Sequence, residues 1–397
     1  MMIRFIARLI TAVMILSAPT LVFSQHGGLG DEHSHKATEA QSNENIEEAH
    51  DEANNESHHA VADRGYDDQD HADEFVPGDF IIHHIADANE IHLFGDVSIP
   101  LPIIIYVEEK GLDVFMSSAF HDEHGGHGHG PTYARGPSTN VLYTKGELGI
   151  TAEDESGAAL TIWDISITKS VFGMFFIILL MILTLKSVAK NYARRPGLAP
   201  KGIASVMEPL ILFIRDGVAY PILGQEKSQK FMPFLLTSFF FIVACNLLGL
   251  IPFIGGFNIT GTIGVTIVLA GLVFIITTIN GNKHYWGHIV SPPGVPFFVK
   301  LILVPIEIFG ILLKPTILMI RLTANISAGH IIILSFVSLI FIFGANSQAG
   351  GMGVGVFSTL FMIFMYFLEL LVAFLQAYVF TLLAAIYFSE ATQEPHH

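Results

Sequence analysis

Thr316-Ile-Leu-Met-Ile-Arg321-Leu-Thr-Ala-Asn325-Ile-Ser-Ala-Gly-His330-Ile-Ile-Ile-Leu is the stretch that decides how this chain folds. It sets one arginine within a long apolar run, and no further charged residue follows until Glu369. A run of this length and hydropathy indicates a helix that lies in a membrane. A charge at that depth costs roughly 2.5–3.5 kcal/mol on insertion scales. It persists only where it pairs, meets water or acts on an ion, so Arg321 is the main indicator of function.

The balance of charge divides the chain near residue 165. From Gln25 to Ile165 there are 29 Asp and Glu against 5 Lys and Arg, and from Ser166 to His397 there are 7 against 13. The first part is acidic and water-soluble in composition, whereas the second is strongly apolar. This contrast excludes a single soluble domain with one core.

Residues 1–24 have the pattern of a secretory signal peptide, with a basic start, an apolar stretch and small residues near a cleavage point. An uncleaved first membrane helix is the alternative, and either interpretation predicts export of the acidic segment. The single cysteine, Cys245, lies in an apolar run and cannot form a disulfide within the chain. We expect it to be buried as a small hydrophobic residue.

The exported segment has two parts. Residues 25–75 are acidic and rich in histidine with almost no aromatic residues, which predicts a disordered segment. Fourteen of the 19 histidines lie between His26 and His129, and that tract is either a solvated tail or a loose metal binder. Residues 76–165 alternate between apolar and polar, and the runs 79–85, 89–94 and 103–107 predict short strands of a small β-rich domain.

Residues 166–392 predict an all-α polytopic membrane domain with about five membrane-embedded helical segments. The uncharged run 170–185 is the core of the first, and a basic cluster follows it, which the positive-inside rule places in the cytoplasm. The cluster consists of Lys186, Lys190, Arg194, Arg195 and Lys201. Residues 203–222 carry three charges and are expected at the cytoplasmic interface.

The rest of the membrane domain consists of two hairpins. The 52 uncharged residues 231–282, with a break at Pro252 and Gly255-Gly256, indicate a helical hairpin. The runs 297–343 and 353–389, separated by residues 346–353, each exceed one perpendicular span of roughly 20 residues. They predict a long, tilted helical hairpin with the C-terminus in the cytoplasm.

Four charged residues recur at intervals of seven, and they are Lys300, Glu307, Lys314 and Arg321. Two helical turns leave a drift of only about 20° per seven residues, so all four share one stripe if Pro305 and Pro315 merely bend the helix. Ion pairing along the stripe explains the two lysines, but Arg321 is harder to explain in that way. Because arginine stays charged, with a pKa above about 12, its role must be electrostatic.

Two further sets of polar residues flank the arginine. Asn325 lies one turn beyond it and could orient the guanidinium group or contact the same partner. His330 faces away from the stripe, towards the last helix, which carries Glu369 and Gln376 on one face. His330 and Glu369 suit a proton relay, and Gln376 is expected near Arg321 as a hydrogen-bond partner; a purely structural role is the alternative for each.

These residues resemble subunit a of F-type ATP synthases. The resemblance covers roughly residues 165–392 and rests on three runs, which together are highly specific. They are Glu307, Lys314-Pro315, Arg321, Asn325 and Ala328-Gly329-His330; Asn246-Leu-Leu-Gly-Leu-Ile-Pro252; and Gln376 to Tyr387. Thr323 and Ala324 depart from the Phe-Gly that is common in the family between the arginine and the asparagine.

The resemblance implies a stator subunit beside a rotor ring of c subunits, held by b-type peripheral-stalk subunits in a bacterial inner membrane. Arg321 would face the rotor carboxylate, keep it ionised and block leakage of protons between two offset half-channels. His330 and Glu369 match the polar pair of the exported-side half-channel, and Gln376 and Asn325 match polar positions beside the arginine. Glu307 is a further candidate residue of the proton path. The resemblance implies neither cofactor, metal nor nucleic-acid binding.

Two rival functions are weaker. A metal transporter is suggested by the His-rich tract, but such transporters carry His and Asp ligand pairs in their membrane helices, and here the last Asp is Asp216. A structural anchor for an exported domain leaves the cost of Arg321 and Glu369 unexplained. The chain lacks a phosphate-binding Gly-x4-Gly-Lys-Ser/Thr loop, so nucleotide chemistry belongs to partners. Proton is favoured over Na⁺ as the coupling ion because His330 suits proton transfer.

Overall fold

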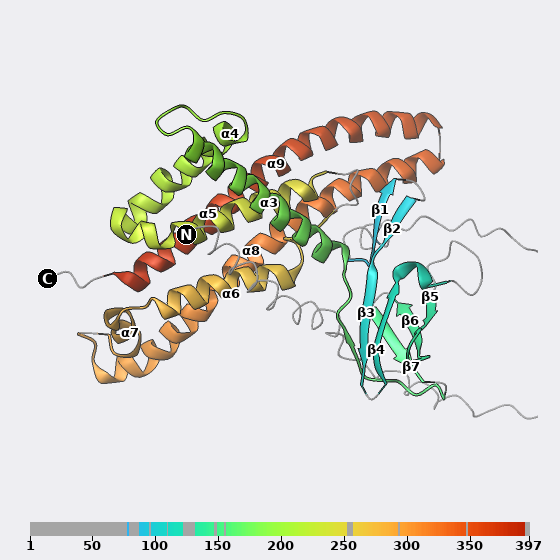
Figure 1. The fold of residues 1–397 in the computed structure, drawn as a ribbon, viewed down its shortest axis with the longest axis horizontal. Coiled ribbons are helices and arrows are strands. Elements are labelled where there is room, and N and C mark those ends of the chain that lie inside the picture. Colours follow the sequence, from blue (N-terminus) through green and yellow to red (C-terminus); the bar gives the residue numbers. More distant parts are fainter. Residues whose placement is uncertain are drawn as a thin grey trace, which may run out of the picture.

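The computed structural model of the chain describes Gly78 and residues 87–94, 97–108, 110–121, 132–146, 149–154, 156–251, 257–292, 294–346 and 348–393. The expected signal peptide (1–24), the expected disordered segment (25–75) and the strand expected at 79–85 lie outside these ranges. Figure 1 shows a helical part that carries a smaller β-rich part at one end.

The helical part is built from seven labelled α-helices. Helix α3 spans Lys169–Arg194, α4 spans Ile203–Ile214, and a π-helical turn at Arg215–Ala219 leads into α5, Tyr220–Gly249. Helices α6 (Ile263–Ile279) and α7 (Lys283–Val290) are bent by 101°. Helices α8 (Phe297–Asn346) and α9 (Gln348–Thr392) form the long hairpin seen in Figure 1.

The predicted class of polytopic helical membrane protein is confirmed. Within the described ranges, 4 helices are long and apolar enough to cross a membrane, or up to 5 if the bent pair α6–α7 counts as one span. Both Pro305 and Pro315 lie inside α8 without ending it, so the four charged residues from Lys300 to Arg321 belong to one helix, as predicted. Membrane helices tolerate such prolines because neighbouring groups satisfy the freed backbone.

Two helix boundaries differ from expectation. Helix α3 begins at Lys169, where the side chain of Thr168 caps it by accepting from Val171 N, and it continues past residue 185 to Arg194. The interruption expected at residues 346–353 is shorter, because α9 already begins at Gln348. The first turns of α9 contain several glycines, and each glycine costs a helix about 1 kcal/mol. In an apolar setting that cost is smaller than the cost of leaving backbone groups without hydrogen bonds.

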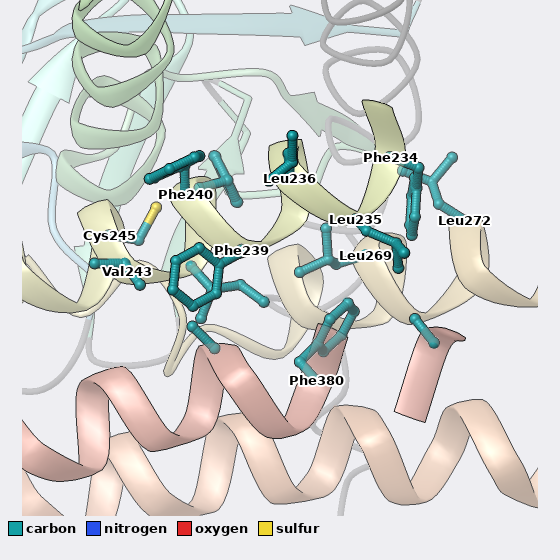
Figure 2. Close-up of a cluster of buried hydrophobic side chains, with 14 of the residues drawn as sticks. Phe234, Leu235, Leu236, Phe239, Phe240, Val243, Cys245, Leu269, Leu272 and Phe380 are labelled. Carbon is teal, nitrogen blue, oxygen red and sulfur yellow. The ribbon is translucent and has the colours of Figure 1, made fainter. Parts of the chain in front are cut away.

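The core of the helical part lies where α5 packs against α6 and α9. Figure 2 shows this cluster, in which Phe239 and Leu235 of α5 approach Leu269 of α6 and Phe380 of α9. The rings of Phe231 and Phe388 stack at a centroid distance of 4.8 Å. The buried face of α9 also carries small residues that let the backbones approach closely, namely Ala373, Ala377, Ala384, Ala385 and Ala391.

Cys245 lies within the same core. Its side chain is 1% exposed, and it is a free thiol. The expectation that it is buried as a small hydrophobic residue is confirmed.

The β-rich part contains three antiparallel sheets. Strands β1 (Glu90–Phe94) and β2 (Val97–Pro100) form a pair. Strand β3 (Pro102–Val107) lies between β4 (Gly111–Met116) and β8 (Ile162–Asp164), and β6 (Leu142–Gly146) lies between β5 (Thr132–Arg135) and β7 (Gly149–Glu153). The sequence predicted strands at 89–94 and 103–107, which match β1 and β3, and missed the others.

Asp113 of β4 ties the two larger sheets together. Its side chain is 0% exposed and accepts hydrogen bonds from the backbone N–H of Ser138 (2.8 Å) and Thr139 (3.1 Å), the hydroxyl of Thr139 and the hydroxyl of Tyr143 (2.7 Å). The turn that it holds connects β5 to β6. Burial raises the pKa of Asp113, but these hydrogen bonds outweigh it and leave the pKa below its ordinary value.

We predict that this carboxylate makes the β-rich part sensitive to acid. Because the folded pKa lies below the unfolded value of about 3.9, the contribution is complete above that pH and is lost as the pH falls through the folded pKa. Asp113→Asn should lower stability at neutral pH by about 1.5–3 kcal/mol and flatten the acid dependence. Thermal melts followed by Trp163 fluorescence in a Trp286→Phe background would measure both effects. A melting temperature that matches that of the Trp286→Phe background at every pH would contradict the prediction.

Candidate functional site

Arg321 lies at the midpoint of α8, on the least covered hairpin of the helical part. The most apolar windows of α8 and α9 are each only 17% buried, compared with 78% for the span Ile203–Gly249. The side chain of Arg321 is exposed, and so are its neighbours Ile317 and Ile320. The arginine therefore stands on an open apolar surface at the depth of the membrane interior.

The guanidinium group has no counter-charge among the residues that the structure describes. Across the part of the chain that the structure describes, no hydrogen bond or ion pair reaches Arg321. Its field does act on the hydroxyl of Tyr387, which comes from α9. A buried or membrane-embedded charge requires compensation. The geometry therefore leaves Arg321 available to water or to an anionic group that lies outside the described residues.

Asn325 and Gln376 pair with each other. Asn325 Nδ2 donates to Gln376 Oε1 at 2.9 Å, which links α8 to α9. Gln376 is 3% exposed, and its Nε2 has no partner within the described structure. From the sequence we expected Gln376 to lie beside Arg321 and Asn325 to orient the guanidinium or to contact the same partner. In the structure Asn325 bonds to Gln376, the residue expected as the partner of Arg321, and within the described residues neither amide bonds to the guanidinium.

Glu369 is buried against the turn of α8 that carries His330. Its side chain is 7% exposed, and a Cβ added to Gly329 would lie 2.7 Å from Glu369 Oε1, so the glycine makes the room that the carboxyl group occupies. Glu369 Oε2 has no partner among the described groups. A buried carboxyl group with a free oxygen is suited to exchange a proton with water or a neighbouring base.

His330 is half-buried and faces the C-terminal end of α5. Its Nε2 would lie 3.6 Å from a Cβ added to Gly249. Within the described ranges, no hydrogen bond or ion pair joins His330 to Glu369. The two side chains are related through α8: the carboxyl group of Glu369 packs against Gly329, and His330 is the next residue of that helix.

The other charged residues of the stripe find partners outside it. Lys314 forms an ion pair with Glu390 of α9, and its Nζ lies 5.3 Å from the ring centroid of Tyr387. Lys300 Nζ donates to the hydroxyl of Ser291 at 3.1 Å. Glu307 is half-buried. The alternative of mutual pairing along the stripe is therefore wrong for the two lysines, because α9 and the segment before α8 supply their partners.

Sequence reasoning missed Lys169, which is buried beside His330. Its side chain is 6% exposed, and it interacts electrostatically with Asp87, Glu90 and His330. The backbone is fixed nearby, because Lys169 N donates to Ala88 O at 2.7 Å and Ser170 N donates to Asp87 Oδ1 at 3.1 Å. Ionisable groups therefore extend from the start of the β-rich part towards His330.

Two polar links position the helices around the site. Asn246 of α5 donates to Ala373 O of α9 at 3.2 Å and accepts from the hydroxyl of Thr260 at 2.6 Å. The hydroxyls of Thr266 and Thr323 lie 2.7 Å apart and join α6 to α8. The sequence indicated Asn246 only as a member of a run that resembles the family. The signal that could have identified it is an amide side chain within an apolar stretch. Thr323 had been noted only as a departure.

The described residues offer no evident metal centre. Within them, no group of three or more His, Cys, Asp or Glu side chains could hold a metal ion. The His-rich tract, for which loose metal binding was one interpretation, lies mostly outside those ranges. The site is accordingly one arginine, two buried side chains with unsatisfied polar atoms, and a half-buried histidine on a membrane hairpin.

A polytopic membrane protein with an uncompensated arginine on a long hairpin is the class that fold and site define. The sequence pattern of the ATP synthase A chain family matches residues 171–389, so the chain belongs to that family. A second pattern, described only as a domain of unknown function, matches residues 80–164, the region of the β-rich part.

Individual relatives agree with this assignment. The chain is 44% identical over 239 residues to ATP synthase subunit a 2 of Chlorobaculum tepidum, a match that covers 58% of this chain and 64% of that protein. It is 39% identical to ATP synthase subunit a of Chlorobium phaeobacteroides over 59% of this chain and 68% of that protein. It is 37% identical to ATP synthase subunit a of Myxococcus xanthus, a match that covers 59% of this chain and 75% of that protein. The chain thus spans just under two thirds of the Chlorobaculum protein.

We predict that the space beside Gly329 is needed for Glu369. Gly329→Ala forces the carboxyl group to move and should cost about 1–3 kcal/mol of stability, as overpacking does. Gly310→Ala is the matched control on the same helix, because a Cβ there meets no atom within 4 Å. It should be neutral or stabilising by up to about 1 kcal/mol. Thermal unfolding of the reconstituted chain measures both, and equal shifts would refute the role given to Gly329.

Proposed function

We propose that this chain is the stator subunit a of a proton-translocating F-type ATP synthase, in which two offset half-channels meet a rotor ring of c subunits. The observation that carries the proposal is the exposed Arg321, which has neither a hydrogen bond nor an ion pair in the described structure, at the midpoint of an apolar helix. Membership of the ATP synthase A chain family supports it. Proton flow through the two half-channels would turn the ring and drive ATP synthesis on other subunits.

Arg321 acts through its charge. A carboxylate that a rotor subunit carries past α8 would meet the guanidinium in a medium of low dielectric constant, where opposite charges attract strongly. The attraction holds the carboxylate in its ionised form between release of one proton and binding of the next. Because the guanidinium itself stays protonated, protons cannot pass from one half-channel to the other through it.

Glu369 and His330 carry protons on the exported side. The ionisable groups Lys169, Asp87 and Glu90 extend from the β-rich part towards His330, which supports a path on that side. The unsatisfied Glu369 Oε2 is a place where water or a proton can bind. Glu307 lies on the same stripe as Arg321, towards the start of α8, and is a further residue of the proton path. The pair Asn325–Gln376 fixes the distance between α8 and α9 beside the arginine.

The orientation in the membrane follows from the distribution of charge. The cluster from Lys186 to Lys201 at the end of α3 lies in the cytoplasm of a bacterial cell, and the acidic residues 25–165 lie in the periplasm. The C-terminus is cytoplasmic, and the membrane is the inner membrane. Partners are the c ring, b-type peripheral-stalk subunits and the rest of the synthase. The chain itself binds no nucleotide.

We predict that Arg321→Ala abolishes ATP-driven acidification of inverted membrane vesicles while the synthase still assembles. Arg321→Lys keeps the charge but loses the planar group and its permanent protonation, so it should pump more slowly than the wild type. Lys300→Ala is a control on the same stripe at the exposed end of α8. Undiminished pumping by an assembled Arg321→Ala complex would make the arginine a structural charge and overturn the proposal.

A second prediction tests the relay pair. His330→Glu and Glu369→His should each slow pumping, whereas the double exchange should pump faster than either by about tenfold, a coupling of about 1.4 kcal/mol. The reason is that the two positions together need one base and one carboxyl group, in either order. Initial rates of vesicle acidification give the comparison. Additive losses in the double variant would show that the two groups do not act as a pair.

A further inference from the structure

The outer face of the sheet β4–β3–β8 is apolar and open. Side chains at alternate positions point away from the domain core, and cross-strand neighbours on this face include Ile104 with Val114 and Tyr106 with both Leu112 and Trp163. Six of its members are between 44% and 54% exposed: Tyr106, Leu112, Val114, Met116, Trp163 and Ile165. An exposed apolar patch of this kind marks a surface that is covered by something else.

The opposite sheet shows what a water-facing surface of this domain looks like. The outer positions of β5–β6–β7 include the exposed residues Arg135, Thr151 and Glu153. Antiparallel sheets commonly bury one face and present a polar one to water. The sheet β5–β6–β7 follows that rule, whereas the strands of β4–β3–β8 carry no charged side chain on their outer face. The charged side chains of β4–β3–β8, Asp113 and Asp164, are buried on its inner face, so its outer face is the apolar one.

The open face adjoins the membrane helix α3. The chain leaves β8 and remains bonded to β3, because Ile165 N donates to Ile104 O at 2.8 Å and Ile167 N donates to Pro102 O at 3.1 Å. Helix α3 begins two residues later and presents its own exposed apolar row. This row comprises Phe172, Phe175, Phe176, Leu179, Leu180 and Leu183. The chain thus passes directly from the exposed apolar face of the sheet to the exposed apolar row of α3.

The arrangement of the two sheets turns this face towards the helical part. The core of the domain lies between them, where Ile103 and Ile105 of β3 cluster with Tyr143 and Ile150 of the other sheet. In Figure 1, β5, β6 and β7 lie beyond β3 on the side away from the helices. The outer face of β4–β3–β8 therefore looks back towards the membrane part. Ile91 and Leu101 fix this position by packing into the core of the helical part.

We propose that the outer face of the sheet β4–β3–β8 rests on the lipid bilayer beside the N-terminal end of α3, with its side chains in the boundary between headgroups and acyl chains. Tyr and Trp favour that boundary because one end of each ring system is polar and the rest is apolar. The absence of charge on this face favours acyl chains over charged headgroups or an acidic partner. The β-rich part then lies on the membrane instead of projecting from it, whatever ion the chain conducts.

The chain has only two tryptophans, so the position of Trp163 can be measured directly. The full chain with Trp286→Phe is placed in lipid nanodiscs that contain phosphatidylcholine brominated close to the headgroup. We expect the emission of Trp163 to be blue-shifted and to fall about twofold relative to unbrominated lipid, as for interfacial groups. Aqueous iodide should quench it weakly. The difference between the wild-type and Trp163→Phe spectra gives the same quantity without Trp286→Phe.

A matched control moves the reporter to the other sheet. The variant Trp163→Phe, Trp286→Phe, Thr151→Trp carries a single tryptophan on the exposed outer face of β7, and it should be quenched by iodide and not by brominated lipid. Quenching of Trp163 by iodide alone would show that the face is open to water and would overturn the proposal. Shielding of Trp163 from both quenchers would also overturn it, because protein, either another segment of this chain or another subunit, would then cover the face.

Discussion

Within a membrane, every polar group must find its partner inside the protein, and this constraint organises the helical part. The amide of Asn246 is satisfied by a backbone carbonyl and a threonine hydroxyl, and Thr266 meets Thr323 across two helices. Lys314 reaches Glu390 near the end of α9. Against this background the unsatisfied atoms of Glu369 and Gln376, and the guanidinium of Arg321, stand out on the α8–α9 hairpin. Unsatisfied atoms also occur elsewhere, at Ser238 of α5 and at Asn258, but the ionisable groups Arg321 and Glu369 lie on the hairpin along which ions would pass under the proposed function.

The hairpin can hold these groups because its two sides differ. One side of α9 is lined with alanines and packs closely on α5, so the backbone is fixed relative to the rest of the bundle. The opposite side, together with most of α8, is uncovered. Under the proposed function, a moving partner would face the uncovered side while the packed side acts as the fixed support. Rigidity and access are thus provided by two faces of the same helices.

The class of fold and the charged residues of the site could be predicted, because apolar length and the cost of a buried charge are visible in the sequence. Arg321 and Glu369 were found in this way. The partners were harder to predict: Asn325 and Gln376 are 51 residues apart and bond to each other because of side-chain directions that spacing alone does not give. Lys169 was missed because its neighbours come from the β-rich part. The apolar outer face of β4–β3–β8 was missed because most of its strands were not predicted.

The missing counter-charge of Arg321 also bears on how a cell would handle this chain before assembly. An isolated copy holds a charge in the membrane interior at a cost of roughly 2.5–3.5 kcal/mol, which is a large part of the stability of an ordinary domain. Its insertion is therefore weakest when it is alone and strengthens once a carboxylate is supplied from outside. Under the proposed function, an unassembled copy would be less stable in the membrane than an assembled one, and we expect membrane proteases to degrade surplus chains first.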